Sequence, residues 1–154
     1  MGIAGVGIPP QEALDPLKVI CLRNTCSEVQ SAEILASLPL FQNLRALHLD
    51  FTATARAEVG DLHPLTSLTK LQALRLGISR PWSAALCDNL KQTIQNTQLR
   101  EISLETSLFK VRTNQFVCDA LKDHPFHHMS ILGFKIKTLA AFDVSCLKTF
   151  SLNI

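Results

Sequence analysis

The chain has 154 residues, of which 47% are hydrophobic and 18% are charged, a balance typical of a globular protein with a sizeable core. The formal net charge is only +2, so the overall field gives no reason to expect binding to nucleic acid or to an anionic membrane. The five cysteines are scattered and form no CxxC pairs, which favours a reducing compartment, and we expect a cytoplasmic protein.

The first sixteen residues carry no recognisable targeting signal. Their apolar run has no basic residues before it and stops at Pro9 and Pro10, which makes it too short for a secretory signal. No other stretch approaches the length of a membrane span. We expect residues 1–16 to be a flexible lead-in or a partial N-terminal cap, and residues 17–154 to form one domain.

A spaced aliphatic motif recurs from residue 17 onward. Its first four copies begin 27, 27 and 28 residues apart, at Leu17, Leu44, Leu71 and Leu99. In each copy the first, fourth and sixth positions are aliphatic, and the last two of these are spaced to lie on the same face of a strand. The motif therefore predicts strands near residues 17–23, 44–50, 71–77 and 99–105.

The segments between these strands are predicted to return as helices, because apolar residues recur there at helical spacing. After the third strand the pattern is carried by Leu86, Leu90 and Ile94, with Ser83 in position for an N-cap. After the second strand Pro64 interrupts the pattern, so an irregular or short-helical return is expected there. Strand, turn and helix therefore form the repeating unit.

The fifth strand has two candidate registers. The motif fits Met129-x-x-Leu132-x-Phe134, which predicts a strand near 129–135 with Ile131, Gly133 and Lys135 facing outward. It also fits Phe126-x-x-Met129-x-Ile131, which restores a 27-residue step but leaves Leu132 facing outward. We favour the first register, because it keeps Leu132 inside.

A sixth strand is predicted near residues 147–153, and the sequence stops at Ile154. No segment with a polar outer face follows it, although terminal repeats of an array normally need one. We therefore expect either a fragment of a longer array or a chain whose end is covered by a partner.

The motif LxxLxLxx, followed by a turn and a helix at a period of 27 or 28 residues, resembles the leucine-rich repeat family, and its length is similar to the ribonuclease-inhibitor-like class. The resemblance covers most of residues 17–152. It implies an α/β solenoid of about five to six repeats, with a curved parallel sheet on the concave side and helices and irregular returns on the convex side. The chain departs from the family at the turn, where Asn or Cys is usual and small hydroxyl residues stand here: Thr25, Thr52, Ser79 and Ser107.

If the aliphatic positions point inward, the residues between them line the concave face. Arg75 should then stand beside His48 and Ser103, with Asp50 and Glu101 diagonal to it. Arg is enriched where protein partners dock, so we expect these five residues to bind a protein partner. The alternative is that they only solvate the face.

Catalytic motifs are not found in the sequence. His48, Asp50 and Ser103 have the chemistry of a triad, but an open sheet excludes little water and offers no oxyanion hole. Cys21 is expected to face outward on the first strand, with no activating base beside it in the sequence. We therefore expect a protein that is not an enzyme and needs no cofactor.

A histidine cluster at His124, His127 and His128 superficially suggests a metal site. Pro125 breaks the helix that would align these side chains, so no metal is expected. We expect instead a polar loop before the fifth strand, with imidazoles packed against Phe126.

Two functions are consistent with these features. The first is non-catalytic protein–protein recognition through the concave face, as an adaptor, receptor or sensor segment. The alternative is a structural repeat fragment that stacks on further repeats or self-associates through its uncapped C-terminal strand, where Leu147, Phe150 and Leu152 lie.

Overall fold

The computed structural model describes residues 17–23, 28–51, 62–78, 82–106, 111–133 and 142–153. Within these ranges six strands form a single parallel sheet, and their order across the sheet follows their order in the chain. The strands are β1 (Val19–Arg23), β2 (Ala46–Phe51), β3 (Ala73–Ile78), β4 (Glu101–Thr106), β5 (His128–Leu132) and β6 (Thr149–Asn153). The predicted α/β fold with a parallel sheet is confirmed.

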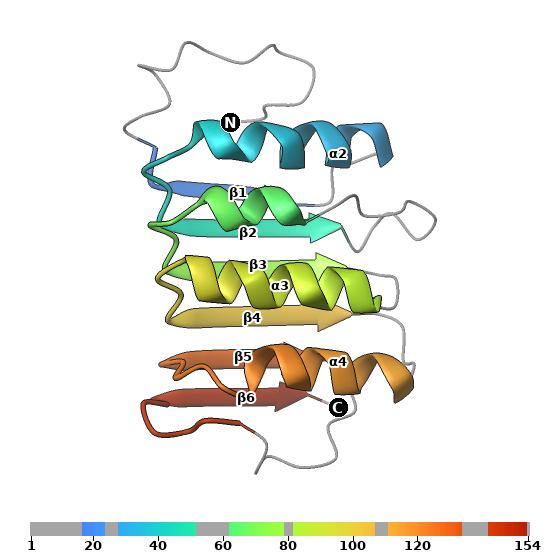
Figure 1. The fold of residues 1–154 in the computed structure, drawn as a ribbon, viewed down its shortest axis with the longest axis vertical. Coiled ribbons are helices and arrows are strands. Elements are labelled where there is room, and N and C mark those ends of the chain that lie inside the picture. The colour runs from blue at the N-terminus through green and yellow to red at the C-terminus, as the bar shows by residue number, and fades with distance from the viewer. Residues whose placement is uncertain are drawn as a thin grey trace.

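The helices of the described ranges lie on one face of this sheet (Figure 1). They are α2 (Glu28–Ser37), α3 (Ala84–Asn96) and α4 (Val111–Leu121), with the short 3₁₀ helices η1 (Leu38–Leu40) and η2 (His63–Ser67). None of them is long and apolar enough to cross a membrane.

Local sequence signals explain two of these returns. The Ser83 side chain caps α3 by accepting a hydrogen bond from the backbone N–H of Leu86 at 3.2 Å. Pro64 stands at the start of η2, where its missing N–H costs no helical hydrogen bond. The predicted lead-in 1–16 and the four hydroxyl turn residues lie outside the described residues.

The core lies between the sheet and the helices. Side chains alternate along β2 and β4 between buried and partly or fully exposed, as the aliphatic spacing predicts. Register neighbours on successive strands form a continuous buried row of residues that are 2–3% exposed: Leu47, Leu74, Ile102 and Met129. Burying each such side chain contributes about 1.5–3 kcal/mol, so the repeated motif fixes which face of the sheet the helices cover.

The predicted register of the fifth strand was wrong. In β5 Met129 and Ile131 are buried, whereas His128, Ser130 and Leu132 point to the opposite face. The strand also begins one residue earlier than predicted and ends at Leu132.

Two local features enforce this register. Phe126 is fully buried, so the aliphatic spacing begins 27 residues after Leu99, as in the earlier repeats. Gly133 has φ +82, a conformation that ends the strand, and an added Cβ there would lie 2.0 Å from the backbone oxygen of Thr106. Phe134 and Lys135 lie outside the described residues.

Candidate functional site

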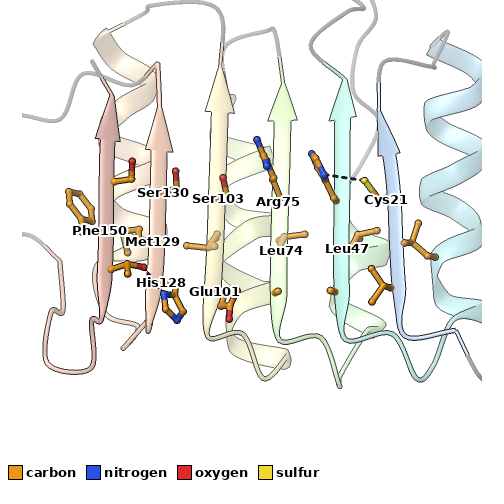
Figure 2. A pocket seen from close by; sticks show the side chains of 18 residues that line it. Cys21, Leu47, Leu74, Arg75, Glu101, Ser103, His128, Met129, Ser130 and Phe150 are labelled. Carbon is orange, nitrogen blue, oxygen red and sulfur yellow. Dashed lines mark hydrogen bonds between the residues drawn. The ribbon is translucent and has the colours of Figure 1, made fainter.

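The face of the sheet opposite the described helices, here called the helix-free face, carries a groove of about 470 Å³. The residues that line the groove come from all six strands, and Figure 2 shows their side chains arrayed across the sheet. Six strands at a spacing of about 4.8 Å make this surface about 24 Å wide.

Two rows of outward side chains cross this face, and strand register defines them. The first row is Val19, Ala46, Ala73, Glu101, His128 and Thr149. The second row, two residues further along each strand, is Cys21, His48, Arg75, Ser103, Ser130 and Ser151. The side chains of β1 to β3 in these rows are small, apolar, thiol, imidazole or guanidinium groups. Those of β4 to β6 are hydroxyl, carboxylate or imidazole groups.

The structure brings four of the five predicted site residues together. His48, Arg75 and Ser103 are register neighbours in the second row, and Glu101 lies diagonal to Arg75 in the first row. Asp50 is on the same face of β2, but its register neighbour is Gly77, one row beyond the groove lining.

Arg75 and Glu101 are the exposed charges at the centre of the groove. In the part of the chain that the structure describes, neither head group has an ion-pair or hydrogen-bond partner. Figure 2 shows why they do not pair: the Arg75 side chain runs toward the carboxyl end of its strand, and that of Glu101 runs toward the opposite end. Two opposite charges are thus presented separately to whatever enters the groove.

Each of the two groove histidines is hydrogen-bonded to the neighbouring strand that lies farther from this centre. His48 Nδ1 lies 3.3 Å from Cys21 Sγ on β1. His128 Nδ1 lies 2.5 Å from Thr149 Oγ1 on β6. Each imidazole is therefore held by a hydrogen bond to the neighbouring strand.

Three serines continue the second row beyond Arg75. Ser103, Ser130 and Ser151 are register neighbours on β4, β5 and β6, which places their Cα atoms about 4.8 Å apart in a ladder. Each hydroxyl can donate and accept a hydrogen bond, so the ladder can bind the amide groups of an extended segment.

Sequence reasoning missed Ser130 and His128 as groove residues because it placed β5 in the other register. The signal that could have found them was the 27-residue step to Phe126. It also missed the contact between Cys21 and His48, because the base that meets Cys21 comes from the next repeat, 27 residues away.

The structure separates the groups of the candidate triad. Arg75 stands between His48 and Ser103 in the second row, so these two residues are two strands, or about 10 Å, apart. A proton cannot pass directly between the Ser103 hydroxyl and the His48 ring over that distance.

The histidine cluster does not converge on a metal. Among the described residues, no group of three or more His, Cys, Asp or Glu side chains is placed to hold a metal ion. His124 packs against Phe126 with ring centroids 4.4 Å apart, and its Nε2 lies 2.6 Å from the carbonyl oxygen of Leu99. The predicted packing against Phe126 is confirmed for His124, whereas His128 belongs to β5 rather than to a loop.

No family model matches the chain, and searches of curated proteins and of solved structures give no match.

Proposed function

We propose that the chain is a non-catalytic protein-recognition module, a solenoid of the leucine-rich repeat type that binds a protein partner through the helix-free face. The observation that carries this proposal is the groove across all six strands, with the Arg75 side chain near its centre and without a partner among the described residues. Its role in a larger assembly would be that of an adaptor, receptor or sensor segment in the cytoplasm.

The shape of the groove supports a macromolecular partner. Sites for small molecules usually enclose most of the ligand surface, whereas this groove is an open strip about 24 Å wide on a sheet. A peptide segment or the edge of a folded domain can contact all six strands at once.

The composition of the groove supports recognition rather than catalysis. An Arg side chain is a frequent hot spot in protein interfaces, because its planar head group makes several directed hydrogen bonds. Arg75 is flanked by small side chains, Ala73 on its own strand and Ser103 on the next, that leave room for a partner to reach it.

The repeat period and the sequential strand order support the solenoid architecture. Within the described ranges each strand pairs only with the strands of adjacent repeats, as in a stacked array. The free thiols of Cys21, Cys87, Cys118 and Cys146 are consistent with a reducing compartment.

The proposal is tested by affinity capture from cell lysate, with the wild-type chain and an Arg75→Glu/His48→Ala variant as baits. Proteins retained by the wild type and lost by the variant are identified by mass spectrometry and purified. The dissociation constants of these proteins are then measured against single variants of the chain that have first been shown to be folded.

We expect Arg75→Glu to weaken binding of such a partner by at least about 2 kcal/mol, or about 30-fold, because it reverses a charge at the centre of the contact. Lys148→Glu is the matched control, since Lys148 is exposed and does not line the groove. Equal losses at both positions would mean that diffuse electrostatics, and not the groove, governs binding. Unchanged binding by Arg75→Glu would exclude the groove as the binding surface.

A further inference from the structure

The groove presents two opposite charges that are unpaired within the described residues, Arg75 on β3 and Glu101 on β4. Strand register separates their Cα atoms by one strand and two residues, or about 8 Å, and their head groups point further apart (Figure 2). Both side chains are exposed, and neither charged group has a hydrogen-bond or ion-pair partner among the described residues.

The imidazoles beside these charges do not pair with them, and Asp50 and Glu105, which lie diagonal to Arg75 on the same face, make no ion pair with it in the described structure. His48, the register neighbour of Arg75 on β2, is hydrogen-bonded outward to Cys21. His128, the register neighbour of Glu101 on β5, is hydrogen-bonded outward to Thr149. Each imidazole thus has one ring nitrogen engaged by the strand farther from the centre, and within the described structure Arg75 and Glu101 keep no hydrogen-bond or ion-pair partner.

The remaining surface near the charges favours a slender ligand. Ala46 and Ala73 form a floor of small apolar side chains on one side, next to the exposed Val19. The hydroxyls of Ser103 and Ser130 lie on the other side. Such a groove accommodates a peptide segment with short side chains more readily than the bulky surface of a folded domain.

We propose that the groove binds a peptide segment of a partner protein that carries one acidic and one basic residue, with their head groups at least about 8 Å apart. The acidic residue pairs with Arg75 and the basic residue with Glu101, while small apolar side chains of the segment cover Ala46 and Ala73. This inference rests on the proposed function and specifies the chemistry of the partner.

A purely acidic or purely basic partner fits less well. A purely acidic segment would bring like charge against Glu101, and a purely basic segment would bring like charge against Arg75. Like charges that face each other across an interface weaken binding and so exclude the wrong partners. A segment with one acidic and one basic residue avoids this repulsion at both Arg75 and Glu101.

The test is a selection of phage-displayed random 12-residue peptides against three forms of the full chain. These are the wild type, the charge-exchanged variant Arg75→Glu/Glu101→Arg, and Ala73→Trp, which fills the floor of the groove. Circular dichroism and urea unfolding establish that each form is folded, and Ser103→Trp replaces Ala73→Trp if the latter is not.

Peptides that bind the wild type but not the groove-filled variant are the groove ligands. We expect them to be enriched in one acidic and one basic residue at a fixed spacing. As synthetic peptides they should lose at least tenfold in affinity against Arg75→Glu, and exchanging their acidic and basic residues should restore binding to the charge-exchanged variant.

Groove ligands without the mixed charge pair, or with charges of one sign only, would overturn this inference and leave the proposed function standing. A selection in which no peptide distinguishes the wild type from the groove-filled variant would count against the proposed function itself.

Discussion

Two cysteines show how surroundings decide what a side chain can do in this chain. Cys87 is 3% exposed inside α3, and burial, with a smaller contribution from the Asp88 carboxylate, raises its pKa to about 12. Cys21 is exposed in the groove, beside the imidazole of His48. The thiolate is the reactive form, so Cys87 acts as an apolar filler of the core, whereas Cys21 is open to reagents.

We expect iodoacetamide at pH 8 to alkylate Cys21 in the folded chain at least about 100-fold faster than Cys87, because a thiol of pKa 12 is only about one part in 10⁴ thiolate at that pH. The rates are measured by mass spectrometry of peptides after timed quenching. Labelling in concentrated urea is the control, since unfolding should make all five cysteines react. Comparable rates for the two thiols in the folded chain would contradict the burial of Cys87.

At the scale of single elements, Gly133 determines where β5 ends. Its φ of +82 is rarely adopted by L side chains, and a Cβ at this position would lie 2.0 Å from the backbone oxygen of Thr106 on β4. A backbone atom held in the sheet cannot move aside cheaply. The glycine therefore fixes both the end of the strand and its register against β4.

Gly133→Ala is expected to lower the free energy of unfolding by at least about 2 kcal/mol, from backbone strain and the clash with Thr106. Urea denaturation measures the change. Ser130→Ala, on the same strand but facing the groove, is the control and should change stability by no more than about 0.5 kcal/mol. Gly133→Asn separates the two causes, because Asn tolerates positive φ but carries a Cβ. Full stability of Gly133→Asn would show that no clash exists.

The sequence predicted well those elements whose hydrophobic pattern is compatible with a single strand register. In the first four repeats the aliphatic positions fit one register only, so the inward and outward faces follow directly. That pattern alone was enough to predict that His48, Arg75 and Ser103 lie side by side. The helical returns followed equally from local signals such as the Ser83 cap.

The fifth repeat was mispredicted because its hydrophobic pattern is ambiguous. Ile131 and Leu132 are adjacent and both aliphatic, so either can be the inward residue. Tertiary contacts decide between them: Phe126 is fully buried, and Gly133 lies against the backbone oxygen of Thr106 with a positive φ. One of the three ladder serines, Ser130, and the His128 contact depend on that decision, so this part of the site required the structure.

At the scale of the whole molecule, the sheet is a one-dimensional array. Each strand pairs only with the preceding and following strands, and β1 and β6 form the edges of the sheet in the described chain. In such an array stability is close to a sum of repeat and nearest-neighbour terms, so edge repeats can open without the rest. The groove is therefore less stable at its edge than at its centre, because Thr149 and Ser151 at one end belong to β6.

We expect native-state hydrogen exchange to show β6 amides opening at a lower free energy than those of β3. Among the described residues the strand is paired on one side only, to β5, and its Phe150 ring is only partly buried, 6.3 Å from that of Phe142. Phe150→Ala should therefore reduce protection in β6 and leave β3 unchanged. Leu74→Ala, at a 2% exposed core position of β3, should instead reduce the protection of β3 by about 2–5 kcal/mol. Equal protection of β3 and β6 would mean that the sheet unfolds as one cooperative unit, and the groove would then be rigid across its full width.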